Sequence, residues 1–185
     1  MAGCRLWADD LCAGAPVRLT PAWDGPPPPH CPPVVADRAG VDLNPLDPAA
    51  DRLRILSYIW AGQDDRLART RAAADLAAGF PGMVTRGDAV DWLATRLATP
   101  RPGHLHLVFH TIAWQYFPAA AQARGAALLT EAGARATPDA PLARLAMEAD
   151  AAPGRAAVTL TVWPGGTPIL MARAGFHGQH IHWLA

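Results

Sequence analysis

The chain has 185 residues, and its 16 arginines balance 14 aspartates and two glutamates, so its formal net charge at neutral pH is zero. This length suits a single domain. Because lysine is absent and the arginines are scattered among aspartates, the sequence has no basic stripe for a nucleic-acid backbone, which excludes nucleic acid as an expected partner. Apolar residues make up 51% of the chain, but 40 of them are alanines, which predicts a folded domain with a lean core.

The sequence carries no membrane or export signal. No apolar run approaches the roughly 20 residues that a membrane-spanning helix needs, and the N-terminus lacks the charged region and long apolar stretch of a secretory signal. The three cysteines, Cys4, Cys12 and Cys31, include no Cys-x-x-Cys pair. We therefore expect a cytoplasmic protein with reduced thiols and no membrane partner.

Residues 1–33 are expected to form an N-terminal strand and a proline-rich arm. The apolar stretch 15–20 predicts the strand, and the four prolines 26–29 predict extended chain, because proline fixes φ and has no N–H to donate. A linker and an SH3-type proline ligand are the two interpretations of this arm. Residues 34–185 are then the folded domain.

From residue 34 onward, short apolar runs alternate with helical patterns, which is typical of an α/β domain with a mostly parallel sheet. Apolar runs predict strands over 34–43, 83–85, 104–110 and 142–147. Periodicity and glycine or proline signals predict helices over 47–60, 64–78, 90–98 and 118–134.

The last part of the chain has a different pattern. The apolar runs 157–163 and 169–174 flank a Pro-Gly-Gly-Thr-Pro segment, which predicts an antiparallel β-hairpin, and 180–184 is a last strand. A mostly parallel sheet flanked by helices and ending in such a hairpin is a Rossmann-like α/β fold. It resembles the C-terminal end of class I S-adenosylmethionine-dependent methyltransferases.

Two acidic residues follow predicted strands at the positions where such a fold binds a nucleoside. Asp42, after Gly40 and Val41, could accept hydrogen bonds from a ribose diol. Asp88, with Ala89 beside it in a Gly-Asp-Ala turn, could accept from an adenine amino group. The alternatives remain open: Asp42 could cap the local turn or the next helix, and Asp88 could cap the helix that follows it.

The segment after the 104–110 strand supplies candidates for the other end of the site. His110 could act as a general base, and Thr111, Trp114 and Tyr116 could line the mouth of a substrate pocket, since ligands of open α/β sheets bind beyond the carboxyl ends of the strands. A structural role for His110 and a core role for the aromatic side chains are the alternatives.

Two histidine pairs have the spacing of residues on one face of a strand, namely His104 with His106 and His180 with His182. Such pairs can bind zinc. No carboxylate or thiolate is spaced alongside to complete a structural site, so no metal ligands are assigned.

Four segments resemble a bacterial family of uncharacterised proteins, the domain of unknown function family 2332. They are Gly40-Val-Asp-Leu-Asn-Pro-Leu-Asp47, Val108-Phe-His-Thr-Ile-Ala-Trp-Gln-Tyr116, Leu160-Thr-Val-Trp-Pro-Gly-Gly166 and Phe176-His-Gly178. The resemblance implies a methyltransferase-like fold without a substrate. It also implies a glycine-rich strand and loop upstream of the segment that resembles residues 6–29, which this sequence lacks.

Three functions follow as hypotheses. The first is an S-adenosylmethionine-dependent methyltransferase, of which this chain is a C-terminal part or a degenerate member. The second is a non-catalytic Rossmann-like binding or scaffold protein, and the third is a metal-dependent enzyme that uses the paired histidines. A domain without its central first strand would have open sheet edges, which predicts self-association. The sequence names no methyl acceptor.

Overall fold

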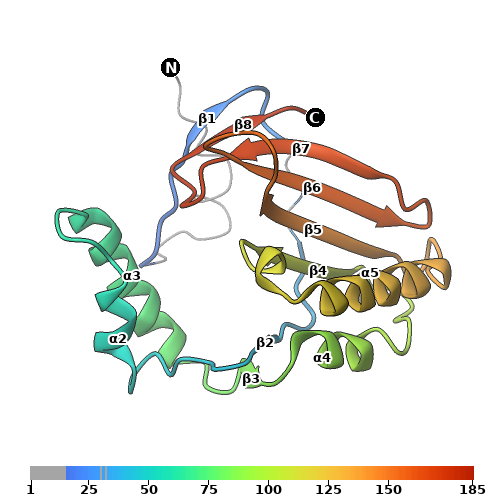
Figure 1. Ribbon diagram of the computed structural model, residues 1–185, viewed down its shortest axis with the longest axis horizontal. Coiled ribbons are helices and arrows are strands. Elements are labelled where there is room, and N and C mark those ends of the chain that lie inside the picture. Colours follow the sequence, from blue (N-terminus) through green and yellow to red (C-terminus); the bar gives the residue numbers. More distant parts are fainter. Residues whose placement is uncertain (1–15, 30, 32) are drawn as a thin grey trace. The chain divides into compact units, whose positions relative to one another are not determined.

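The computed structural model in Figure 1 describes residues 16–29, 31 and 33–185. Cys4, Cys12 and the first residue of the predicted 15–20 strand lie outside the described residues. The chain divides into two compact units. The described residues of the first unit are 20–29 and 90–185, and those of the second unit are 16–19, 31 and 33–89.

The first unit contains a six-stranded sheet in the order β1-β8-β7-β6-β5-β4. Its strands are β1 (Ala22–Asp24), β4 (His106–Thr111), β5 (Leu142–Ala149), β6 (Ala156–Trp163), β7 (Pro168–Ala174) and β8 (His180–Trp183). Strands β4 and β5 are parallel, as are β1 and β8, whereas β5 to β8 form an antiparallel meander (Figure 1).

The predicted C-terminal hairpin is confirmed as β6 and β7, but the sheet is mixed rather than mostly parallel. The physical reason is the length of the connections. A parallel pair needs a crossover of a dozen or more residues, and the short turns after β5, β6 and β7 allow only antiparallel neighbours.

The N-terminal strand lies at Ala22–Asp24 and not over 15–20 as predicted. It pairs in parallel with β8, where Trp23 stacks on Trp183 with ring centroids 5.4 Å apart. The indole of Trp183 thus supplies an apolar contact that the 16–20 segment lacks. Part of the predicted arm is therefore an edge strand of the sheet.

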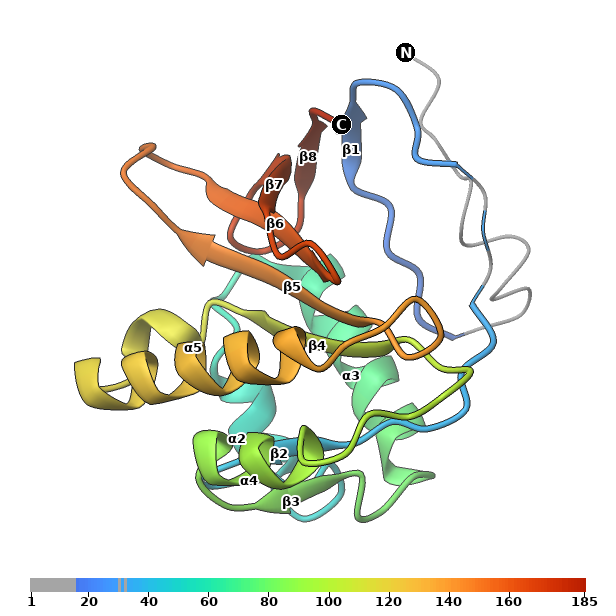
Figure 2. The same ribbon diagram turned by 90° about the vertical axis from the view of Figure 1, so that its right-hand side faces the viewer.

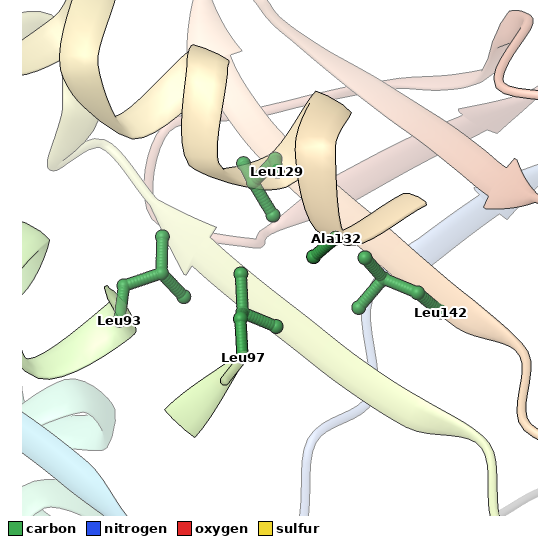
Figure 3. Packing of buried hydrophobic residues seen from close by; sticks show 5 residues of the cluster. All are labelled: Leu93, Leu97, Leu129, Ala132 and Leu142. Atoms are coloured by element: carbon green, nitrogen blue, oxygen red, sulfur yellow. The ribbon is translucent and has the colours of Figure 1, made fainter. Parts of the chain in front are cut away.

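Helices α4 (Ala89–Arg96) and α5 (Ala119–Ala134) form the hydrophobic core of this unit together with one strand of the sheet. Leu93 and Leu97 from α4 and its end, Leu129 and Ala132 from α5, and Leu142 from β5 point toward one another (Figure 3). Figure 2 shows α5 lying along the β4–β5 part of the sheet. The core is small, as the alanine-rich composition predicts.

The second unit contains a parallel pair of short strands, β2 (Gly40–Asp42) and β3 (Val84–Arg86), with helices α2 (Arg52–Ser57) and α3 (Asp64–Ala78) between them in the chain. An ion pair between Arg52 and Asp75 joins the two helices. The predicted 34–43 strand is confined to three residues, and the predicted 47–60 helix to six.

The late start of α2 has a local cause. The Asp47 carboxylate accepts hydrogen bonds from the N–H groups of Ala49 and Ala50, and the Asp51 carboxylate accepts one from the N–H of Asp47. These bonds hold residues 47–51 in a turn, so the helix begins only at Arg52. Across the described residues, none of the helices is long and apolar enough to cross a membrane.

Candidate functional site

Asp42 and Asp88 lie at one edge of the second unit. Strands β2 and β3 are parallel and in register, with Gly40 opposite Val84 and Asp42 opposite Arg86. Asp42 is the last residue of β2, and Asp88 follows the end of β3 by two residues. Because parallel strands end at the same edge, the structure brings both carboxylates to the edge at which open α/β sheets bind ligands.

Asp42 is held in place by its own turn. Its Oδ1 accepts a hydrogen bond of 2.7 Å from the N–H of Asn44, and its carbonyl accepts one of 3.0 Å from Gly87. Arg86 binds the same turn, through the Leu43 carbonyl at 3.2 Å and the Asn44 Oδ1 at 3.0 Å. Asp42 Oδ1 therefore caps the local turn, as the capping interpretation of Asp42 predicts, and Oδ2 of the same carboxylate takes no part in this cap.

A cleft of about 380 Å³ opens beside Asp42. Its lining combines polar and apolar side chains, and all of them belong to the second unit: Asp42, Asn44, Pro45, Leu46, Arg54, Tyr58 and Val84. It offers a carboxylate, a guanidinium and a phenol ring within one hollow. Such a lining suits a ligand that has hydroxyl donors, an anionic group and a flat ring.

Sequence reasoning missed Arg54 and Tyr58. Arg54 lies in α2 and Tyr58 is the residue that caps its C-terminal end, and Arg54 Nε donates a hydrogen bond of 3.3 Å to the Tyr58 hydroxyl. This bond raises the pKa of Arg54 further above its ordinary value. The i, i+4 spacing was readable from the sequence, but only the structure shows that both side chains line the same cleft as Asp42.

Asp88 and Ala89 lie at the junction of β3 and α4. Asp88 is exposed and directly precedes Ala89, the first residue of the helix. That position is the N-cap of α4. A capping role and an adenine contact both predict the Asp88 carboxylate at this position. The two interpretations of Asp88 therefore stay open.

His110, in the first unit, is the centre of a polar network that joins β4 to β5. Its Nδ1 lies 2.6 Å from Glu148 Oε1, and Arg144 Nε donates a hydrogen bond of 3.1 Å to its Nε2. Nε2 must then be unprotonated, so the proton of a neutral ring sits on Nδ1 and is donated to the Glu148 carboxylate. Burial, together with the positive charge of Arg144, lowers the pKa of His110 and outweighs the opposing effect of Glu148.

Glu148 is the acceptor at which this network converges. Besides His110, its carboxylate accepts backbone N–H groups of Ala113 at 3.1 Å, Trp114 at 3.0 Å and Gln115 at 3.4 Å. Burial opposes its ionisation, but the hydrogen bonds from His110 and the three N–H groups prevail and lower the pKa of Glu148. Glu148 thus fixes the short helix η1 (Trp114–Tyr116) against β5.

Trp114 is enclosed by groups of its own unit. The Arg144 guanidinium lies 4.4 Å from the indole centroid, the His110 ring stacks on the indole with centroids 5.2 Å apart, and the Phe117 ring lies tilted at 5.5 Å. The indole also packs on Gly125 of α5, where a β-carbon would approach Trp114 Cη2 to 2.5 Å. This environment matches the core alternative for Trp114.

The other two predicted substrate residues lie elsewhere. Tyr116 is 73% exposed in η1, and Thr111 ends β4 on the side away from His110. Arg144 and Glu148, which the sequence reasoning missed, carried a signal: two charges four residues apart within an otherwise apolar strand require partners.

The paired histidines do not gather ligands. His104 lies before β4 rather than on it, with its ring bonded to the Pro102 carbonyl at 3.0 Å. His180 and His182 do share a face of β8, where His182 pairs with Asp24 at 3.3 Å. In the part of the chain that the structure describes, no group of three or more metal-ligating side chains is close enough to hold an ion.

Comparison with known proteins identifies the family. The model of the family described as "Uncharacterized protein conserved in bacteria (DUF2332)" matches residues 6–183. The chain belongs to this family. No curated protein and no solved structure matches the chain. The description of the DUF2332 family names no ligand or reaction.

Proposed function

We propose that this DUF2332 protein is a Rossmann-like, S-adenosylmethionine-dependent methyltransferase-like protein that binds its cofactor in the second unit. One observation carries the proposal: Asp42 and Asp88 follow neighbouring parallel strands at one edge, and Asp42 lines a cleft of about 380 Å³. Clefts of about 300–1,000 Å³ are usual for small ligands. The open end of a parallel β pair is also where a nucleoside binds in doubly wound folds.

The chemistry of the lining fits this cofactor. Asp42 Oδ1 is used by the Asn44 N–H, and Oδ2 has no hydrogen-bond partner among the described residues, so it remains available to a ribose diol. Tyr58, which is 60% exposed, offers a ring face for adenine, and Arg54 offers a cation for the carboxylate of the methionine end. The Asp88 carboxylate is assigned to the adenine amino group, from which it would accept a hydrogen bond, and Ala89 beside it is assigned to the cofactor site.

The cofactor supplies an activated methyl group, and the protein contributes mainly orientation of donor and acceptor. His110, Thr111, Trp114 and Tyr116, the residues that the sequence predicts for the acceptor side, belong to the first unit and are not assigned to the cofactor cleft. A neutral imidazole is the form of His110 that can accept a proton. It acts as a base only if Arg144 leaves Nε2, because the Nδ1 proton is donated to Glu148.

The same network favours a second candidate, a non-catalytic Rossmann-like binding or scaffold protein. Both ring nitrogens of His110 are occupied by side chains of the chain itself, which is the arrangement of a structural histidine. In this second candidate the chain keeps the fold but does not bind the cofactor, so a titration with the cofactor product separates the two.

Isothermal titration of S-adenosylhomocysteine into the purified chain tests the cleft. We expect saturable one-to-one binding, which D42N weakens by about ten- to a hundredfold because a hydrogen bond to a charged group is worth about 1.5–3 kcal/mol. The asparagine keeps the Oδ1 that accepts the Asn44 N–H, so the turn should survive. D88A should weaken binding on a similar scale.

The matched control is D65N, an exposed aspartate of α3 that does not line the cleft. It should leave the dissociation constant unchanged. No binding by a cooperatively melting chain, or equal losses in D42N and D65N, would refute the cofactor assignment. Absence of binding by the folded chain would also select the scaffold candidate, whereas saturable binding would justify a screen for methyl acceptors.

A further inference from the structure

The open edge of the six-stranded sheet, formed by β4, has the composition of a central strand. Strand β4 is at one end of the strand order and pairs only with β5 among the described residues. Its six residues, His-Leu-Val-Phe-His-Thr, include no acidic residue, lysine, arginine or proline. Natural edge strands usually carry charges, prolines or bulges that block pairing with another chain, and β4 has none of them.

The two faces of β4 are arranged unusually for an edge. Its burial alternates, with His106, Val108 and His110 on the inner face and Leu107 and Phe109 on the exposed one. Phe109 is 70% exposed and Leu107 46%. An exposed strand face is normally polar, whereas apolar residues on both faces are typical of strands covered on both sides.

The exposed apolar face continues across the sheet in register. Phe109 lies opposite Leu145, Leu145 opposite Leu160, and Leu160 opposite Ile169. This row, which we call the apolar row, crosses from β4 to β7 on the face away from the Leu142 core. Its two ends are exposed, Phe109 at 70% and Ile169 at 52%.

The backbone of β4 is oriented for pairing at this edge. The N–H groups of His106 and Ile112 donate toward β5, to the carbonyls of Pro141 and Met147 at 2.9 and 2.7 Å. Since alternate residues of a parallel strand bond to the same neighbour, the N–H and C=O groups of Leu107, Phe109 and Thr111 point to the open side.

We propose that two copies of this chain pair through their β4 edges, antiparallel about a two-fold axis perpendicular to the sheet. With Phe109 on the axis, Phe109 faces its own copy and Leu107 faces Thr111 of the other copy, and none of these residues carries a charge. A zero net charge of the chain adds no repulsion between copies. The axis keeps both apolar rows on one face and makes the Phe109 side chains cross-strand neighbours.

The pairing goes beyond the proposed function and does not depend on cofactor binding. The pairing also closes on itself. Once two β4 edges are paired, neither of them is left to pair with a third copy, so the assembly is a dimer. Sedimentation equilibrium of the full chain over a range of concentrations should therefore fit a monomer–dimer equilibrium with no larger species.

Three variants separate edge pairing from other contacts. F109K places like charges opposite each other across the axis and should raise the dimer dissociation constant at least tenfold. L107P removes an outward N–H, a position where an edge strand tolerates proline, and should have the same effect. I169K alters the far end of the apolar row and should leave the dimer unchanged. Circular dichroism melting of each variant establishes that it is folded.

Dimers weakened by F109K and L107P but not by I169K support the edge pairing. A monomer at every concentration overturns it, as do polydisperse aggregates. Equal weakening by F109K and I169K also overturns it, since that pattern requires packing of one sheet face on another. If L107P or F109K fails to fold, hydrogen exchange of the wild-type chain decides: protection of the Leu107 and Phe109 amides must rise with concentration.

Discussion

Replacing Glu148 by alanine should destabilise the first unit, because this carboxylate accepts several hydrogen bonds at once. The carboxylate is only 17% exposed and accepts hydrogen bonds from His110 Nδ1 at 2.6 Å and from the N–H groups of Ala113 and Trp114 at 3.1 and 3.0 Å. The Gln115 N–H, at 3.4 Å, is a weaker fourth donor. In E148A these donors lose their acceptor together.

The magnitude follows from that geometry. Each of the three shorter bonds is worth at least about 1 kcal/mol once water has partly replaced the carboxylate, which gives about 3 kcal/mol in total. In a chain of this size about 1 kcal/mol lowers the melting temperature by about 2–4 °C, so E148A should melt about 6–12 °C below the wild type. E148Q keeps one acceptor oxygen, so its melting temperature should lie between those of the wild type and E148A.

The assay combines thermal melting with native-state hydrogen exchange, because exchange locates the loss. The amides of Ala113, Trp114 and Gln115 should exchange faster in E148A, while those of the β6–β7 hairpin should change less. The control is E131A, whose carboxylate is 72% exposed and 3.5 Å from Arg135, an exposed helix pair worth about 0.3–0.5 kcal/mol. If E148A melts within 2 °C of E131A, or if the three amides keep their protection, our account of this network is wrong, since about 2 °C corresponds to less than about 1 kcal/mol.

Three further predictions concern the first unit. Burial lowers the pKa of His110 and hydrogen bonds lower that of Glu148, so the unfolded chain binds more protons than the folded one as the pH falls. The urea midpoint should therefore fall as the pH drops below about 6.5 and again below about 4.5. A midpoint that rises on acidification would contradict this. G133A should lower the free energy of unfolding by about 1–3 kcal/mol despite the higher helix propensity of alanine, because the alanine β-carbon would overlap the Trp163 ring. A variant that is more stable than the wild type in chemical denaturation would contradict this prediction. L129A, at a side chain only 2% exposed in the core, should cost about 2–5 kcal/mol in the same assay, and a loss below 1 kcal/mol would show that this core does not hold the unit together.

The local signals in the sequence located most elements of the fold. Gly79 marks the end of α3 as predicted, and the Pro-Gly-Gly-Thr-Pro segment forms the turn between β6 and β7. The errors arose where nonlocal contacts decide. Trp23 forms a strand because Trp183, 160 positions further along the chain, stacks on it, and no pattern within residues 16–29 encodes that contact.

In the candidate site, too, local features could be predicted from the sequence and nonlocal contacts could not. Asp42 and Asp88 could be placed at one edge because the end of a strand is a local feature, and the in-register pairing of β2 with β3 agrees with that placement. Arg54 and Tyr58 could not be assigned, since an exposed arginine and tyrosine have no distinctive pattern in the sequence, and only the folded chain brings them into one cleft with Asp42.

His110 illustrates why a residue type at a strand end does not determine its chemistry. A base needs an unprotonated nitrogen that faces a substrate, and Nε2 is unprotonated here only because it accepts a bond from Arg144. Arg144 is in turn held over the Trp114 ring, so releasing Nε2 would also give up a cation–π contact at 4.4 Å. A catalytic role for His110 therefore requires a ligand that attracts the Arg144 guanidinium more strongly than Trp114 and His110 do together.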